Sequence, residues 1–145
     1  MPDKPKRMYD LIDTTADIGV KAYGKDLCEL FESCALAMFD IISDTKKIDG
    51  KGEMEIKLAV DELDQLLVDF LNNLLYFKDT DNFVFASCKV KKISKKNGKW
   101  LLDATMSGEV FQKGKHVVGK DVKAATYHRL EINEKEGYAT VIFDI

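Results

Sequence analysis

The sequence predicts an α+β domain in which two helices pack on a mostly antiparallel sheet. Apolar residues recur at helical spacing in two segments, residues 26–42 and 61–77. After Asn82 the composition is strand-like to the end of the chain. Strands joined by short turns pair antiparallel, so the predicted order is β-α-β-α-β-β-β-β. One domain is expected over residues 8–145, after a flexible leader of residues 1–7.

The first strand and helix have clear signals. From Ile18 to Ala22, apolar and other residues alternate with the period of a strand, which Gly24 ends. Asp26 is predicted to cap the first helix, with Glu29 at the third position of a capping-box-like pair. This helix is apolar on nearly all sides, so more than one element is expected to bury it.

The second strand and helix follow a loop at residues 43–52. Between Met54 and Val60 every second residue is apolar and most of the others are charged. This alternation is typical of a strand with one solvent-exposed face. Asp61 is predicted to cap the second helix, with Asp64 at the third position. The helix has one apolar stripe, formed by Leu63, Leu66, Leu67, Phe70, Leu71, Leu74 and Leu75.

The second half of the chain is predicted to contain four strands, over residues 83–94, 100–111, 122–132 and 138–145. The first is long enough to be bent or bulged. Asn97-Gly98 is a strong hairpin turn signal. A closing hairpin is expected around residues 133–137, and the chain then ends within a core strand.

The composition limits the partners. With a net charge of -3 and a pI near 5.4, the chain has no overall footprint for phosphate backbones. Any role on RNA is therefore expected to be indirect or through a local patch, without sequence-specific nucleic-acid binding. No apolar run reaches the ~18 residues needed to span a bilayer, and no membrane partner is expected. Cys28, Cys34 and Cys88 lack CxxC spacing and suit reduced thiols in the cytoplasm.

The usual catalytic motifs are missing. The glycines form no P-loop, and no GxSxG elbow is present. Neither histidine has metal-motif spacing. Strict alternation places His128 on the face of Leu130 and Ile132, as a core or edge residue, whereas His116 is expected in an exposed loop. We therefore expect no enzyme.

Two acidic residues differ from the many on helix surfaces. Asp17 and Asp144 each sit at the end of an apolar strand. If these ends meet, the Ile145 carboxylate joins them, and two unit charges about 4 Å apart repel by roughly 4 kcal/mol at an effective dielectric near 20. Such a cluster must hold a proton, pair with a basic side chain or bind a hard cation, for which Ca²⁺ is better suited than Mg²⁺.

Several stretches resemble the archease family, in order and over nearly the whole chain. The second helix and the run VKAATYH, residues 122–128, contribute to the resemblance, as does the terminal DI. The matching stretches are Thr15 to Gly24, Asp26 to Glu32, Ala37 to Phe39, Leu66 to Tyr76, Gly108-Glu109, His116, Val122 to His128 and Phe143 to Ile145.

The resemblance implies a non-enzymatic accessory protein of tRNA splicing. Archeases activate an RtcB-type RNA ligase by promoting guanylylation of its histidine and multiple turnover. They bind a divalent cation, typically calcium, through residues that match Asp17, Asp144 and Ile145 here.

One position departs from the family pattern. The leading His of the family's His-Thr-Ala-Asp motif is Thr14 here. If that His acts in the partner's active site, this chain activates differently or uses Asp13 or His128. If it only supports the loop, the Thr14 hydroxyl substitutes. Asp13, Thr14, His116 and His128 are thus the candidate accessory or partner-facing residues.

Two alternatives belong to other functional classes. A chaperone-like partner of an RNA-modifying enzyme, such as a tRNA methyltransferase, would use a patch on the apolar first helix. A stand-alone metal-dependent hydrolase is disfavoured because no general base, nucleophile and metal set stands out.

Overall fold

The structure is a computed structural model that describes residues 8–12 and 16–145. Its elements follow one another as β1 (Tyr9–Ile12), β2 (Ile18–Tyr23), α1 (Leu27–Ile42), η1 (Thr45–Lys47), β3 (Gly52–Val60), α2 (Leu63–Asp81), β4 (Phe83–Lys96), β5 (Lys99–Val110), β6 (Ala124–Ala125), β7 (Glu131–Asn133) and β8 (Tyr138–Asp144). The predicted leader, residues 1–7, lies outside the described residues, as do Asp13 and Thr14.

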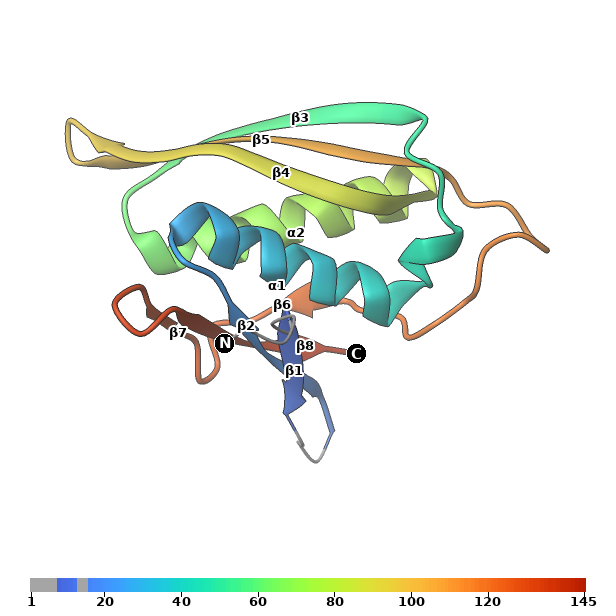
Figure 1. The fold of residues 1–145 in the computed structure, drawn as a ribbon, viewed down its shortest axis with the longest axis horizontal. Coiled ribbons are helices and arrows are strands. Elements are labelled where there is room, and N and C mark those ends of the chain that lie inside the picture. Colours follow the sequence, from blue (N-terminus) through green and yellow to red (C-terminus); the bar gives the residue numbers. More distant parts are fainter. Residues whose placement is uncertain (1–7, 13–15) are drawn as a thin grey trace, which may run out of the picture.

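Three layers build the fold, with both helices in the middle (Figure 1). One outer layer is a three-stranded sheet in the order β3-β5-β4. The other has the order β1-β2-β8-β6, and β7 also pairs with β8. All recorded strand pairs are antiparallel. The α+β prediction is confirmed, but the helices lie between two sheets and not on a single one.

Helix α1 is apolar on nearly all sides, so a sheet is needed on each side of it to bury its surface. It packs against β4 on one side and β2 on the other. As the sequence predicts, Asp26 caps it and accepts the Glu29 N–H at 2.9 Å. Every residue of α1 is buried or half-buried. Between α1 and the three-stranded sheet, Phe39 stacks on Phe85 at a centroid distance of 4.9 Å, and between the two helices Phe31 lies 6.0 Å from Phe70.

The N-cap of helix α2 lies one residue later than predicted. Its N-cap is Glu62, which makes no side-chain capping bond. Asp61 instead accepts a hydrogen bond from Lys99 Nζ at 2.6 Å. At the other end Asn82 adopts the left-handed conformation, with φ of 52°, and ends the helix. The prediction that Asp61 caps this helix is wrong.

The predicted strand over residues 122–132 is also wrong. Only Ala124–Ala125 and Glu131–Asn133 are strands, and a turn separates them. In this turn the Leu130 N–H donates to the Tyr127 carbonyl at 3.2 Å, and Arg129 has a φ of 54°. Alternation could not reveal the break, because arginine is not a residue that signals positive φ. The structure adds β1, which was not predicted as a strand.

The other strand predictions are confirmed. β4 is long and bulged, with register shifts between Phe85 and Ser87 and between Val90 and Lys92. Asn97-Gly98 turns the hairpin, with φ values of 54° and 77°. None of the helices in the described part of the chain combines the length and apolar character needed to cross a bilayer.

Candidate functional site

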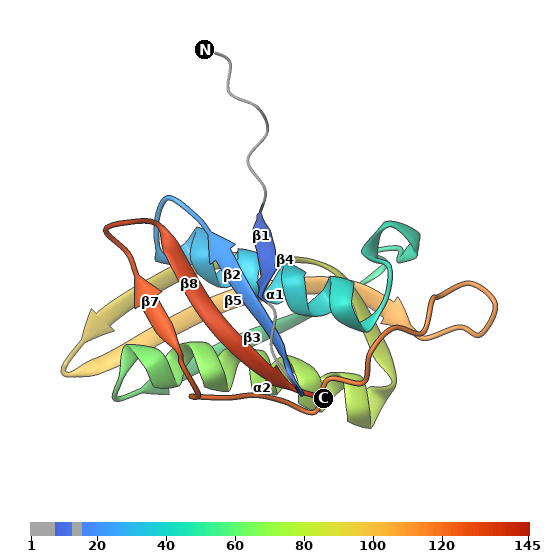
Figure 2. The same ribbon diagram turned by 90° about the horizontal axis from the view of Figure 1, so that it is seen from below.

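The ends of β2 and β8 meet, as the carboxylate hypothesis requires. Ile18 pairs with Phe143 in the antiparallel register. The next positions outward are Asp17, in the bend just before β2, and Asp144, the last residue of β8. Ile145 follows directly, and the C-terminus lies beside the start of β2 (Figure 2). Asp17 is half-buried, and Asp144 is exposed.

The end of β8 is held firmly from the core side. Phe143 is fully buried, and its neighbour Asp144 pairs with Ala124 of β6. The Asp144 carbonyl also accepts the Lys123 N–H at 2.7 Å. The backbone of Asp144 is therefore fixed by strand pairing while its carboxylate points into solvent.

Helix α2 fixes β6 in turn through one side chain. The Asn72 amide accepts the Ala125 N–H at 2.7 Å and donates to the Ala125 carbonyl at 3.2 Å. The Asn72 side chain thus binds the backbone of β6, a strand of only two residues that is otherwise paired with β8 alone. The sequence shows Asn72 on the polar face of the helix but cannot show this contact.

An open groove of about 400 Å³ adjoins Asp17. Asp40 also lines it, but that carboxylate already accepts hydrogen bonds from Tyr9 at 2.9 Å and Thr45 at 2.6 Å. Burial and the Asp40 contact raise the pKa of Tyr9 to about 12, so this hydroxyl stays a donor. The groove is lined by Tyr9, Leu11, Ile12, Asp17, Ile18, Asp40, Ile41 and Lys120.

The donor set at the strand ends consists only of carboxylate oxygens, which hard divalent cations prefer. Among the described residues, no three His, Cys, Asp or Glu side chains come together in a way that could hold a metal ion. A cation between Asp17 and Asp144 would therefore need the main-chain carboxylate of Ile145 as its third carboxylate. These three residues fit a hard cation by chemistry, and the site stays a prediction.

The burial of the two histidines is the reverse of the prediction. His128 is exposed in the 127–130 turn, where its backbone N–H donates to Thr126 Oγ1 at 3.3 Å. His116 is buried, with its residue 6% exposed. Within residues 8–12 and 16–145, no hydrogen bond or ion pair joins either histidine's ring to Asp144, and the His116 ring contacts Glu109 instead.

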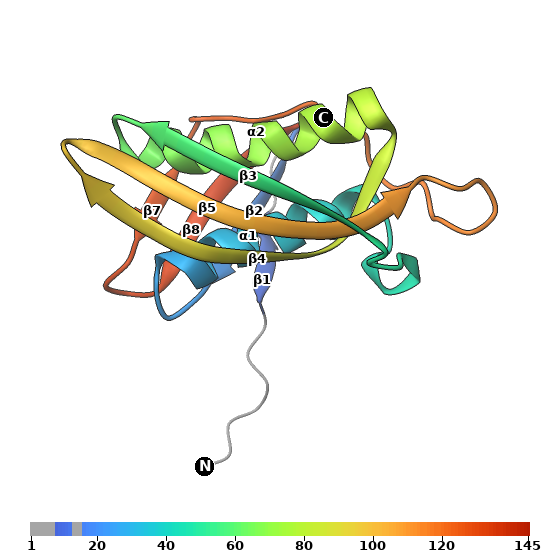
Figure 3. The same ribbon diagram turned by 90° about the horizontal axis from the view of Figure 1, so that it is seen from above.

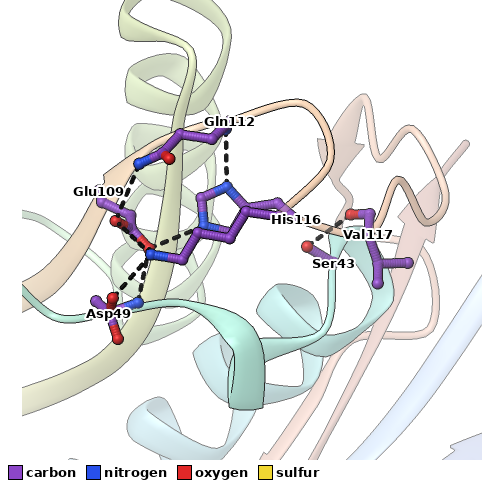
Figure 4. Close-up of polar contacts among 7 residues, drawn as sticks. Ser43, Asp49, Glu109, Gln112, His116 and Val117 are labelled. Atoms are coloured by element: carbon purple, nitrogen blue, oxygen red, sulfur yellow. Dashed lines mark hydrogen bonds and ion pairs between the residues drawn. The ribbon is translucent and has the colours of Figure 1, made fainter.

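His116 and Glu109 are the buried members of a polar cluster (Figure 4). Its Nδ1 accepts the Gln112 backbone N–H at 2.8 Å, so the proton of the neutral ring is on Nε2. Nε2 donates to Glu109 Oε2 at 2.8 Å. Lys115 Nζ lies 2.8 Å from the same oxygen and 2.7 Å from Asp49 Oδ2. Sequence reasoning identified Glu109 and His116 only through the family resemblance.

Hydrogen bonds lower the pKa of Glu109 to about 2, from an ordinary 4.5. The Lys115 ammonium contributes most, followed by the Asp49 backbone N–H, and His116 adds to them. Because the folded pKa is depressed, this contribution to stability is complete above pH 4.5 and is lost as the pH falls toward 2.

The Glu109→Gln variant is therefore expected to lose stability less steeply than the wild type between pH 4.5 and 2. Urea midpoints measured at intervals from pH 6 to pH 2 test this. Glu134→Gln, at an exposed carboxylate, is the control and should follow the wild type. Parallel curves for all three proteins would contradict the assignment.

The segment after the cluster docks on the end of α1. Ser43 Oγ donates to the Val117 carbonyl at 2.6 Å, and the Gly119 N–H donates to the Ile42 carbonyl at 2.8 Å. A Cβ at Gly119 would lie 2.3 Å from the Ile41 oxygen, so only glycine allows this approach. The segment satisfies carbonyls in the last turn of α1 and brings Lys120 to the groove beside Asp17.

The cysteines do not form a reactive site. Cys28, Cys34 and Cys88 are free, as predicted. Burial raises the pKa of Cys34 and of Cys88 to about 12, which keeps both thiols protonated.

Known proteins resemble the chain over its whole length. The archease protein family (MTH1598/TM1083) matches residues 9–145. Protein archease of Methanosarcina mazei is 40% identical over 147 residues, covering 100% of both chains. Protein archease of Pyrococcus furiosus is 43% identical and covers 87% of this chain and 88% of that one. The solution structure of Methanobacterium thermoautotrophicum protein 1598 superposes with a TM-score of 0.79 at 34% identity, covering 95% of this chain and 99% of that one. The chain therefore belongs to the archease family.

Proposed function

We propose that this archease activates an RtcB-type RNA ligase of tRNA splicing by promoting its guanylylation and turnover. Archeases are non-catalytic, so the chain itself is not an enzyme. The observation that supports the proposal is the register of β2 and β8, which pairs Ile18 with Phe143, so that Asp17 and Asp144 are the next residues outward at the same end of the sheet. The free cysteines support the cytoplasm as the place of this function.

In this proposal Asp17, Asp144 and the Ile145 carboxylate hold a divalent cation, which we take to be Ca²⁺. When bound, the cation would neutralise the carboxylates and attract the nucleotide phosphates of the ligase. The protein contributes placement, because paired strands and the buried Phe143 hold the acidic tip in a fixed position. The exposed Asp144 side chain makes the tip accessible to a partner.

A guanylylation assay with the cognate ligase tests the proposal. Asp144→Ala is expected to reduce activation at least tenfold, since a lost metal ligand should cost no less than the 10–100-fold typical of outer-shell changes. Glu134→Ala is the control, because Glu134 is an exposed carboxylate at the other end of the β7–β8 hairpin. Full activation by a folded Asp144→Ala protein would refute the metal tip.

A C-terminal tag is expected to lower Ca²⁺ affinity roughly tenfold or more, because an amide replaces the Ile145 carboxylate. Titration calorimetry on tagged and untagged protein measures the change. A protein with the same tag at its N-terminus serves as the control. If the C-terminally tagged protein binds Ca²⁺ with unchanged affinity, Ile145 is not a ligand.

Asp13 and Thr14 are proposed as partner-facing residues, as in the sequence analysis, and both lie outside the described residues. His128 is exposed on the turn after β6 and keeps its place in this proposal. His116 does not, because its ring is enclosed by the Glu109 cluster.

The chaperone-like alternative, a partner of a tRNA methyltransferase, depended on an apolar patch on the first helix. That patch is not available, because no residue of α1 is exposed. No other observation on the described chain favours this alternative over ligase activation.

A further inference from the structure

The hairpin between β4 and β5 has a charge unlike that of the rest of the chain. Of the 22 Lys and Arg residues, six lie between Lys89 and Lys99, a stretch that contains no Asp or Glu. All 25 acidic residues lie elsewhere. We call residues 89–99 the lysine hairpin. All six of its lysines are exposed: Lys89, Lys91, Lys92, Lys95, Lys96 and Lys99.

A β-bulge increases the charge that the hairpin presents to solvent. The register shifts between Val90 and Lys92, so Lys91 is an extra residue in β4. Val90 and Ile93 both pack toward the core, and the two lysines between them are both exposed. Without the bulge, Lys92 would alternate to the core face. The backbone irregularity thus keeps two consecutive lysines in solvent.

Most of these lysines lack an acidic partner. Lys91 lies 3.6 Å from Glu55, and Lys99 lies 2.6 Å from Asp61. No ion pair involves the other four within the part of the chain that the structure describes. Lys96 is directly opposite Lys99 in the ladder, and like charges at such a position are destabilising. An anionic ligand would relieve this repulsion.

An aromatic ring lies at the base of the turn. The Lys95 ammonium is 5.7 Å from the centroid of the Trp100 ring, and Trp100 is half-buried. Lysines beside an aromatic side chain are typical of surfaces that bind single-stranded nucleic acid, where phosphates meet the charges and a base stacks on the ring. An anionic membrane surface would instead favour a face with an exposed apolar side, which this hairpin does not offer.

Lysines on an edge strand also prevent strands of different molecules from pairing, and β4 is an edge strand. Edge protection does not require both lysines of the bulge in solvent or a like-charge pair at the tip. Edge protection also predicts a different result, since replacing the lysines would cause aggregation and would leave ligand affinity unchanged.

We propose that the lysine hairpin binds the phosphate backbone of single-stranded RNA without sequence preference. The choice of RNA rests on the proposed function in tRNA splicing, and the charge pattern alone requires a polyanion. The hairpin belongs to the three-stranded sheet, across the helix layer from the end of β8, and its tip projects from one end of the molecule (Figures 1 and 3). The acidic tip can therefore engage the ligase while the hairpin contacts RNA.

Fluorescence anisotropy with a labelled 20-nucleotide RNA, on the protein without ligase, tests the proposal. Each lysine that neutralises a phosphate of a single strand contributes about 0.7 to the slope of log K against log salt. Four lysines without an acidic partner predict a slope of roughly -3, or a roughly 50-fold loss of affinity between 50 and 200 mM salt. The Lys92→Gln/Lys96→Gln variant should halve the slope, and the Lys92→Arg/Lys96→Arg variant should restore it.

The Lys46→Gln/Lys47→Gln variant is the matched control, because both residues are exposed in η1, away from the hairpin tip. It should bind RNA like the wild type. Equal losses in both Gln variants, no binding at 50 mM salt, or equal affinity for poly-glutamate or for anionic vesicles would overturn the proposal. Aggregation of the hairpin variant with unchanged RNA affinity would assign the lysines to edge protection.

The ligase assay separates this inference from the proposed function. Guanylylation modifies a histidine of the ligase and is assayed with no RNA added, so the Lys92→Gln/Lys96→Gln variant should activate it as the wild type does. If RNA binding fails but guanylylation is stimulated, only the lysine hairpin proposal is wrong. If RNA binds but guanylylation is not stimulated, the acidic-tip proposal is wrong.

Discussion

Ca²⁺ is expected to raise the melting temperature of the wild-type protein by several degrees and that of Asp144→Asn much less. A ligand at one hundred times its Kd stabilises the folded state by about 2.7 kcal/mol. For a chain of this size that corresponds to roughly 5–10 °C. The Asn side chain keeps the shape of Asp144 but removes a negative ligand, so most of this shift should disappear.

Without metal the order of stability is expected to reverse. Asp17 and Asp144 each follow the Ile18–Phe143 pair at the same end of the sheet, and like charges brought close together repel. Asp144→Asn should therefore be at least as stable as the wild type in a chelator and less stable in saturating Ca²⁺. Thermal melts in both conditions measure this crossing, with Glu134→Gln as the control. A variant that is destabilised equally in both conditions would show a structural role for Asp144, not a metal site.

The strand ends that carry Asp17 and Asp144 could be predicted from the sequence, and the site itself stays a prediction. Alternation around Ile18 and in residues 138–145 identified two core strands, and each has an aspartate at its end. The register pairs Ile18 with Phe143, so both aspartates come next at the same end of the sheet. What the sequence did not show is the support behind the tip. Asn72 contacts Ala125 across 53 positions of the chain, and no local pattern predicts such a contact.

The layer arrangement was only partly predictable. The apolar character of α1 on nearly all sides indicated burial by more than one element, and the structure confirms it. The sequence alone nevertheless predicts a single sheet, because strand pairing between distant segments leaves no local signal. Joining β2 to β8 and β3 to β5 produces two sheets, and each pairing links segments far apart in the chain.

The histidines show where alternation fails. Alternation places His128 on the apolar face only if residues 122–132 form one continuous strand. The turn that contains Arg129, with φ of 54°, interrupts that strand, so the assignment of His128 to the apolar face no longer holds. His116 lies in a polar loop, which ordinarily means exposure. Its burial depends on Glu109, which lies at the end of β5, and on Asp49, which is distant in sequence. Side-chain partners of this kind appear only once the fold is assembled.

Replacing the two histidines is therefore expected to give opposite results to those that the sequence predicts. His116→Ala removes the acceptor for the Gln112 backbone N–H and one donor to Glu109. Because the His116 ring and Glu109 are both buried, losing the ring and its hydrogen bond should lower the free energy of unfolding by about 1–3 kcal/mol. His128→Ala should change it by less than about 0.5 kcal/mol, as is usual for exposed positions.

Urea unfolding at neutral pH measures both variants, and the slope m should stay unchanged if only stability is affected. His116→Asn is the informative rescue, because its Oδ1 can occupy the place of Nδ1 and accept the Gln112 N–H. It should recover part of the loss, whereas His116→Leu, which fills volume without an acceptor, should not. If His116→Leu is as stable as the wild type, the ring serves packing alone. In that case the docking of residues 111–121 on α1 does not depend on the hydrogen bonds of His116.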